Sequence, residues 1–211
     1  MASRRTFLRI AGTSAVILAA GAVGLTQCDP MPEGAIQAWK GPAPNVKDPR
    51  VRALSFALLA PNPHNMQPWI VDLSEPGVIS FLCDRRRLLP ETDPYARQIT
   101  IGCGAFLELL RMAAAEQGFR ADVAAFPNGD WPANGVGDAP VARVAFVPDA
   151  GVARDPLFAQ VLGRRTNRQS YDLALLAATE GDAIGAATSA KQVRYGWTQQ
   201  ANDMNRLRDI A

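Results

Sequence analysis

A long amphipathic stretch in the middle of the chain, "DPYARQITIGCGAFLELLRMAAAEQG" (residues 93–118), dominates the folding pattern. An Asp followed by Pro is a common helix start, and a glycine is a common helix end. Between them, apolar side chains recur on one helical face: Ile101, Ala105, Leu109, Met112 and Ala113. The pattern predicts a helix from Asp93 to Gly118. Gly102 and Gly104 weaken that helix unless another helix or a ligand packs closely against them.

The segments on either side predict an α+β fold, because their strands and helices do not alternate. A short helix is predicted at 49–60, with Pro49 in its first turn. Branched and aromatic residues predict strands at 69–73 and 78–82, joined by the turn "SEPG", and at 121–127 and 141–148. Further helices are predicted at 155–169, 172–190 and 198–211, with a short strand at 192–197. We therefore expect an antiparallel or mixed sheet flanked by helices.

Composition indicates a globular body without a nucleic-acid surface. Hydrophobic residues make up 48% of the 211 residues and charged residues 20%. Beyond residue 38 the chain holds 19 Lys and Arg against 18 Asp and Glu, so the body is nearly neutral. Binding to nucleic acid needs a basic face, which this balance does not favour. A small basic site for a single phosphate stays open.

The three cysteines do not form a metal-binding pattern. Cys28, Cys83 and Cys103 show no CxxC spacing, and His64 is the only histidine. No zinc or other metal site is therefore predicted. Cys83 and Cys103 lie in apolar runs, which favours buried structural thiols over a redox pair.

The N-terminus has the layout of an export signal. A basic start is followed by an apolar, Ala- and Gly-rich stretch that is short for a membrane span. The segment "SRRTFLR" (3–9) resembles the twin-arginine export motif, which implies export to the periplasm or the outer face of the inner membrane. Cleavage before Trp39, lipidation at Cys28 and an uncleaved membrane anchor all stay open. Residues 1–38 are thus interpreted as signal and start of linker, and 39–49, rich in Pro and Gly, as linker.

Two short stretches carry the chemistry that the sequence offers. The loop "APNPHNMQPW" (60–69) combines prolines with amide side chains and the only histidine. The stretch "GRRTNRQSYD" (163–172) places Arg164 and Arg168 four residues apart, on one face if it is helical, with Thr166 between them. Two guanidinium groups and a hydroxyl suit a phosphate, although a solvated basic helix end has the same composition. One histidine without a partner does not predict acid–base catalysis, so no catalytic residue is assigned.

Taken together, the two stretches resemble signatures of the nitroreductase family of FMN-dependent oxidoreductases. The loop matches the family pattern at Pro61, Asn62, Asn65, Gln67, Pro68 and Trp69, and the basic segment matches it at Arg164, Arg165, Thr166 and Arg168. The resemblance covers residues 50 to about 175. It implies that the basic segment holds the FMN phosphate and that the loop of a partner subunit lies against the flavin. The cofactor-binding residues it implies are Pro61, Asn62, Pro63, Asn65, Gln67, Arg164, Arg165, Thr166 and Arg168. The helix at 93–118 resembles the family's central dimer helix.

The order of the two motifs is the reverse of that in the ordinary family. Here the loop comes first and the basic segment about a hundred residues later. This order resembles the single-chain branch in which two nitroreductase-like lobes form an internal pseudo-dimer. Residues 50–150 are then the first lobe, and 151–211 begin a second lobe that is incomplete. A homodimer is the alternative arrangement.

The resemblance implies an exported FMN-binding oxidoreductase. Its flavin would take hydride from NAD(P)H and reduce a nitro- or quinone-type small molecule, with the chemistry supplied by the cofactor. Two alternatives stay open: a protein that binds and sequesters flavin without turnover, and an inactive fragment. The substrate, the electron donor outside the cytoplasm and the role of His64 are not assigned.

Overall fold

A computed structural model describes residues 33–132, 135–172, 174–189 and 194–210. By its internal contacts the chain divides into two units, residues 1–166 and residues 167–211. The predicted export signal lies almost entirely outside the described residues, and the division into signal, linker and two lobes stays a prediction.

The first unit is built on a four-stranded antiparallel sheet with strand order β1-β2-β4-β3. The strands are β1 (Trp69–Asp72), β2 (Val78–Cys83), β3 (Phe119–Ala125) and β4 (Ala142–Pro148). All four strands were predicted, with ends within about two residues of those observed. Together with the helices below, the sheet confirms the predicted α+β class.

Arg50 ties the β1–β2 turn to the neighbouring helix α3 (Pro49–Ala57). Its guanidinium donates to the carbonyl oxygens of Leu73, Glu75 and Val78 at 3.1, 2.8 and 2.8 Å. Asp48 caps the helix by accepting from the Arg50 backbone N–H at 2.8 Å, and it also pairs with the Arg50 side chain. The start of α3 and the hairpin turn are therefore held by one shared cluster of hydrogen bonds.

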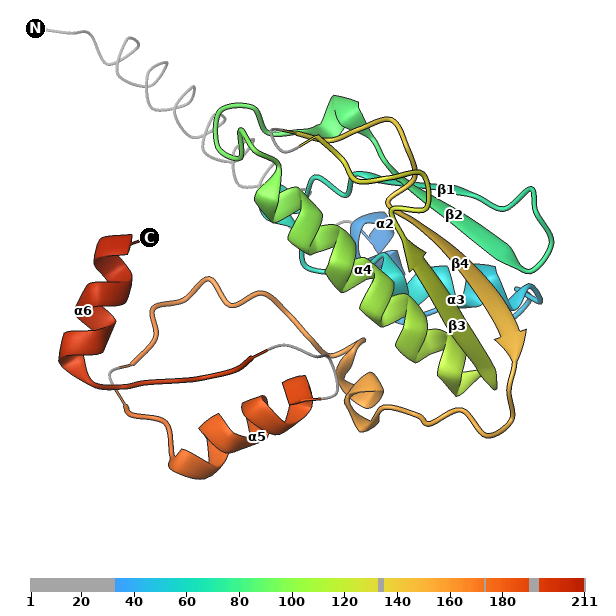
Figure 1. The fold of residues 1–211 in the computed structure, drawn as a ribbon. Helices are drawn as coiled ribbons and strands as arrows, with labels where there is room; N and C mark the ends of the chain where they lie inside the picture. Colours follow the sequence, from blue (N-terminus) through green and yellow to red (C-terminus); the bar gives the residue numbers. More distant parts are fainter. Residues whose placement is uncertain (1–32, 133–134, 173, 190–193, 211) are drawn as a thin grey trace, which may run out of the picture. The chain divides into compact units, whose positions relative to one another are not determined.

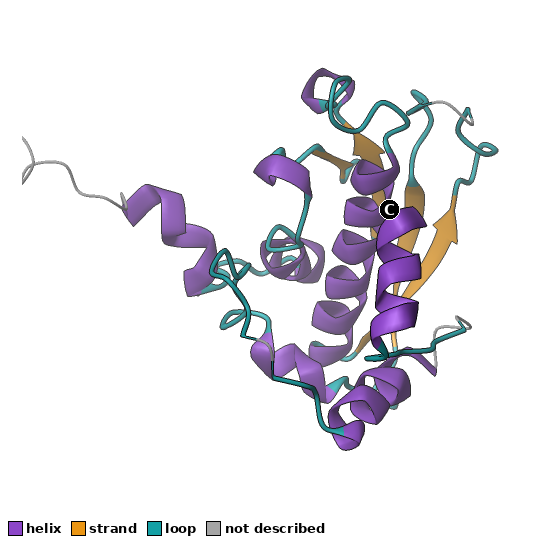
Figure 2. Cartoon of the chain, turned by 90° about the vertical axis from the view of Figure 1, so that its left-hand side faces the viewer, coloured by secondary structure: helices purple, strands orange, loops and turns teal. Residues whose placement is uncertain are grey.

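The long helix α4 (Arg97–Glu116) lies along the sheet with α3 beside it (Figures 1 and 2). Its predicted start at Asp93 is wrong, because Ala96 adopts a left-handed conformation, with φ of 51°, that breaks the helix. The buried Asp93 still supports the first turn, since its carboxylate accepts from the Ile99 N–H at 3.0 Å. At the other end Gly118, with φ of 76°, turns the chain into β3.

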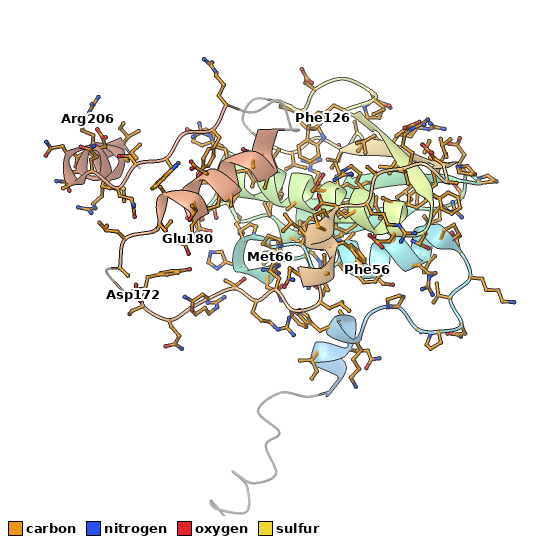
Figure 3. All side chains as sticks on the ribbon, turned by 90° about the horizontal axis from the view of Figure 1, so that it is seen from below. Phe56, Met66, Phe126, Asp172, Glu180 and Arg206 are labelled. Atoms are coloured by element: carbon orange, nitrogen blue, oxygen red, sulfur yellow. The ribbon has the colours of Figure 1, made fainter. Side chains whose placement is uncertain are left out.

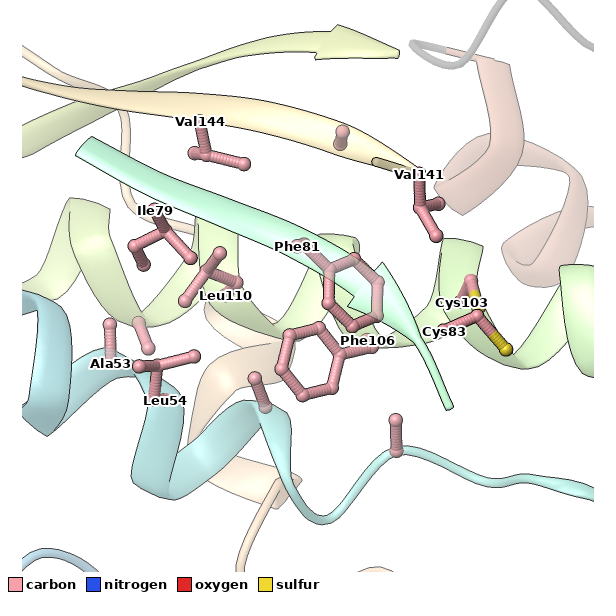
Figure 4. Close-up of a cluster of buried hydrophobic side chains, with 14 of the residues drawn as sticks. Ala53, Leu54, Ile79, Phe81, Cys83, Cys103, Phe106, Leu110, Val141 and Val144 are labelled. Carbon is pink, nitrogen blue, oxygen red and sulfur yellow. The ribbon is translucent and has the colours of Figure 1, made fainter. Parts of the chain in front are cut away.

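The core of the unit lies between α4, α3 and the sheet (Figure 4). Phe81 of β2 stacks on Phe106 of α4 with ring centroids 4.4 Å apart, and Ile79, Leu110 and Val144 are fully buried around them. The apolar face predicted for this helix is only partly buried. Met112 and Ala113 are buried, but Ile101 is 73% exposed. The helix carries apolar residues on more than one face, and the face with Ile99, Cys103, Phe106 and Leu110 is the one in the core.

Among the described residues, α4 has the length and apolar composition of a membrane span. Half of its most apolar window is buried inside the unit, as in a core helix.

The helix predicted at 155–169 is mostly absent. Asp155 does cap a helical turn, accepting from the Leu157 N–H at 2.9 Å, but only the short 3-10 helix η4 (Pro156–Gln160) forms. Phe158 of this turn packs on Phe56, labelled in Figure 3, with ring centroids 4.9 Å apart. Residues 164–168 have no helical structure. Gly163, Thr166 and Asn167 are weak helix formers, so nothing local extends the turn.

The second unit contains α5 (Ala178–Ser189) and α6 (Ala201–Ile210). Gly181 and Gly185, four residues apart on α5, leave room for the rings of Trp197 and Tyr195, which pack where glycine Cβ atoms would be. The Tyr195 hydroxyl also donates to the Gly181 carbonyl at 3.2 Å. Residues 194–197 are not a strand, while the first residues of the strand predicted at 192–197 lie outside the described residues.

Candidate functional site

The loop at residues 60–69 links α3 to β1 and is seated on α4. A Cβ atom at Gly102 would lie 3.4 Å from the Cβ of Asn62 and 3.6 Å from the carbonyl oxygen of Pro61. Gly102 therefore permits the close approach that the sequence suggested, and the neighbour is this loop. Around Gly104 a Cβ atom would meet nothing within 4 Å among the described residues.

Asn62 uses its side chain to brace the loop itself. Its Oδ1 accepts from the Gln67 backbone N–H at 2.8 Å, and its Nδ2 donates to the Ala60 carbonyl at 3.1 Å. A third hydrogen bond in the loop is donated by Gln67 Nε2 to Asn65 Oδ1 at 3.3 Å. The Asn62 amide is thus committed to the fold, whereas the amino group of Asn65 and the carbonyl oxygen of Gln67 stay uncommitted among the described residues.

The backbone of this loop is strained. His64, Asn65 and Gln67 have φ angles of 49°, 53° and 47°, a left-handed region that residues other than glycine rarely adopt. The short 3-10 helix η2 (Pro63–Asn65) contains two of them. Such strain persists only where the surroundings impose it, and it clusters at functional sites. All three side chains are exposed.

The far end of the loop is anchored in the core. Pro68 is fully buried, and the ring of Trp69 packs on Phe106 with centroids 5.0 Å apart. Arg87, in the 3-10 helix η3 (Arg85–Arg87), donates to the Met66 carbonyl at 3.0 Å. The exposed, strained residues are therefore held between two fixed ends.

Arg164 joins the basic segment to the base of the loop. Its Nη2 donates to the carbonyl oxygen of Leu59 at 2.8 Å, across 105 residues of sequence. Leu59 directly precedes the loop that begins at Ala60. The side chain of Arg164 uses one of its nitrogen atoms here, and its Nε and Nη1 atoms have no hydrogen bond among the described residues.

The other basic residues are arranged differently from the prediction. Because residues 164–168 are not helical, Arg164 and Arg168 do not share a helix face. Arg165 donates from Nη1 to the carbonyl oxygens of Leu162 and Arg164, both at 2.8 Å, and its Nε and Nη2 atoms have no hydrogen bond among the described residues. Thr166 is exposed. Arg168 belongs to the second unit, so its position relative to the loop is not defined and its role stays a prediction.

A cavity that the sequence did not indicate lies at the N-terminal end of α4. It has a volume of about 490 Å³ and is lined by Tyr95, Arg97, Thr100, Ile101, Phe126, Asp130, Trp131, Pro132 and Gly135. The Arg97 guanidinium lies 5.1 Å from the centre of the Tyr95 ring. Thr100 and Ile101 precede Gly102, so one turn of α4 borders both this cavity and the loop. Phe126 and Trp131, two aromatic residues in a stretch with two prolines and a glycine, are the signal that could have indicated this cavity.

Cys83 and Cys103 form a buried thiol pair at the end of β2 (Figure 4). The hydrogen bond from Cys103 lowers the pKa of Cys83. The same bond, together with burial, raises the pKa of Cys103. Both thiols are free and lie in the apolar core, the environment expected for structural thiols.

No family model matches the chain. Over 121 residues, 56% of this chain, it is 39% identical to the "Putative NAD(P)H nitroreductase acg" of Mycobacterium tuberculosis and covers 34% of that protein. Over 154 residues, 66% of this chain, it is 33% identical to a second protein of that organism named as a putative NAD(P)H nitroreductase, covering 42% of it. An uncharacterized protein of the same organism is 35% identical over 125 residues, 57% of this chain and 35% of that protein.

The chain therefore spans about a third to two fifths of the length of these curated relatives. Two of them carry the nitroreductase name, and this similarity supports the resemblance drawn from the loop and the basic segment.

Proposed function

We propose that this chain contributes a flavin site to an FMN-dependent NAD(P)H oxidoreductase of the nitroreductase type, which reduces nitro- or quinone-type small molecules. The observation that carries the proposal is the hydrogen bond from Arg164 to Leu59, because it brings the start of the basic segment to the base of the amide-rich loop. The names of two relatives support the same reaction class.

The uncommitted groups of the site suit the two ends of FMN. Nε and Nη1 of Arg164 and the hydroxyl of Thr166 can donate to a phosphate. The Asn65 amino group and the Gln67 carbonyl oxygen can donate to and accept from a planar heterocycle. When bound, the flavin supplies the hydride-accepting chemistry, and the protein supplies position and electrostatics.

The remaining residues of the predicted site hold the loop and the basic segment in shape. Asn62 closes the loop on itself, and Pro61 and Pro63 restrict the loop backbone on either side of it. Arg165 folds back on its own segment through two carbonyl oxygens. The phosphate-binding role of Arg168 is carried by the family resemblance alone. Asn65 and Gln67 are exposed, so both side chains are accessible to a ligand.

Location and assembly are part of the proposal. The chain is exported by a twin-arginine route, and the site forms either within a two-lobed chain or between two subunits. Cell fractionation of the tagged chain tests the first point, with Arg4→Lys plus Arg5→Lys as the variant. Export that depends on the arginine pair supports the route, and unchanged export of the double variant contradicts it.

The function is tested with the full chain by adding FMN, removing free cofactor and recording the flavin absorbance. Anaerobic addition of NADPH should bleach the bound flavin, and a quinone should restore the colour. Colour that resists bleaching by both NADH and NADPH would replace the oxidoreductase by a flavin-sequestering protein. A colourless protein that does not bind added FMN would overturn both.

A further inference from the structure

A short segment that precedes α3 packs against the basic segment. It comprises the 3-10 helix η1 (Gln37–Lys40) and Gly41, and is called the N-terminal strap below. Gly41 has a φ of 78°, and a Cβ atom there would lie 3.6 Å from Cδ1 of Leu162. The strap is therefore in contact with the residues that lead into the basic segment, although its sequence predicts only a linker.

Trp39 makes the central contact of the strap. The Arg165 guanidinium lies over its ring, 4.6 Å from the ring centre, a geometry in which a cation is attracted to the aromatic face. The indole Nε1 is buried and has no hydrogen-bond partner among the described residues. The ring face of Trp39, and not its N–H group, is thus what holds Arg165.

The basic segment depends on such side-chain contacts, because it has no helix to hold it. Arg165 is fixed from three sides, by the Trp39 ring and by the carbonyl oxygens of Leu162 and Arg164. The Arg164 carbonyl belongs to the residue whose side chain reaches Leu59. Fixing Arg165 therefore restrains the backbone on both sides of it, at Arg164 and at Thr166.

We propose that Trp39 is a positioning residue for the phosphate-binding segment. By clamping Arg165 it sets the backbone from which Arg164 and Thr166 present their donors. In this arrangement Arg165 is a structural cation and does not bind the phosphate. The ligand part of this inference rests on the proposed function, while the clamp itself does not. Loss of residues 37–41 would remove the clamp.

The clamp is tested by limited proteolysis of the full chain with trypsin. Trypsin cuts after an arginine only when it binds that side chain, so the side chain must first leave its contacts in the protein. The measured quantity is the rate of cleavage after Arg165 divided by the rate after Arg168. Both arginines are exposed, and the Trp39 ring contacts Arg165. Trp39→Ala should raise this ratio about two- to five-fold, the range that corresponds to loss of an exposed cation–π contact. Trp39→Phe keeps an aromatic face and loses no hydrogen bond, so it should restore most of the protection. Lys40→Ala, an exposed neighbour in the strap, is the matched control.

The positioning role is tested by comparing the affinities for FMN and riboflavin, which differ by the phosphate. Trp39→Ala should weaken FMN binding about two- to five-fold and leave riboflavin binding within error, with rescue by Trp39→Phe. Equal weakening for both flavins would indicate general loosening and overturn the positioning role. An unchanged trypsin ratio in Trp39→Ala would overturn the clamp. If the wild-type chain binds neither flavin, the proposed function fails, and the trypsin ratio still decides whether the clamp exists.

Discussion

At the scale of single residues, the sequence identified the polar side chains of the candidate site but not their hydrogen-bond partners. Asn62, Asn65 and Gln67 were grouped as amides for a heterocycle. In the structure Asn62 is consumed by the loop, because its carbonyl and amino groups both bond backbone atoms. Arg165 is one of the predicted phosphate-binding residues, a role that stays a prediction, and its Nη1 atom donates to two carbonyl oxygens. Such assignments depend on distances of a few ångströms, which spacing along the chain does not determine.

The Asn62 brace should make a measurable contribution to stability. Asn62→Ala removes both hydrogen bonds and leaves the Gln67 N–H without its acceptor, so we expect a loss of about 1–3 kcal/mol in the free energy of unfolding. Gln67→Ala is the matched control, since it removes one longer bond between exposed side chains and does not replace an Asn in a left-handed conformation. Urea unfolding of both variants provides the measurement. Equal losses would show that the brace is no stronger than the surface contact.

The pair formed by Asp48 and Arg50 should make stability depend on acid. The hydrogen bond from Arg50 lowers the pKa of Asp48 below its ordinary value of 3.8. The unfolded chain then binds a proton at higher pH than the folded one, so this contribution is present above pH 3.8 and is lost as the pH falls through the folded pKa. Asp48→Asn should therefore lose less stability than wild type between about pH 5 and about pH 2. Identical slopes of unfolding free energy against pH would contradict this.

At the scale of elements, local pattern was sufficient for the four strands of the sheet. It failed at 194–197, which was predicted as part of a strand, and for part of the helices. The β1–β2 hairpin was predicted because branched and aromatic residues flank a clear turn. The start predicted for α4 is wrong, and its predicted apolar face is only partly buried. Ala96 is held in a left-handed conformation by its surroundings, and the choice between two apolar faces is made by the sheet. The helix predicted at 155–169 ends after one short turn, because Gly163, Thr166 and Asn167 are weak helix formers and do not extend it.

The two glycines of α4 should respond oppositely to added side chains. Gly104 faces open space among the described residues, so Gly104→Ala should raise the free energy of unfolding by about 0.5–1 kcal/mol through helix propensity. Gly102 faces the loop at Asn62, so Gly102→Val should displace the loop and lower stability. Thermal unfolding of both variants, together with Gly104→Val, gives the comparison. Equal effects of Val at the two positions would show that the loop is not seated on Gly102.

At the scale of the whole molecule, the long-range arrangement could be anticipated only through the family resemblance. No periodicity or composition links the loop at 60–69 to the basic segment, and the expectation that both contact one flavin came from the family resemblance. The N-terminal strap had no such guide, because Trp39 lies in a stretch rich in proline and glycine. The relatives extend well beyond the length matched here, and Arg168 lies in the second unit. The role of Arg168 at the phosphate therefore stays a prediction.

The most direct test of the flavin site is the affinity of the full chain for FMN, measured by fluorescence titration in wild type, Arg164→Ala and Arg206→Ala. Arg164 is proposed to donate to the phosphate, and charge-assisted hydrogen bonds of this kind correspond to about a ten- to hundred-fold change in affinity. We expect Arg164→Ala to weaken FMN binding by that factor and riboflavin binding much less, and Arg206→Ala, an exposed arginine of α6, to match wild type. Wild-type affinity for FMN in Arg164→Ala would contradict the proposed site.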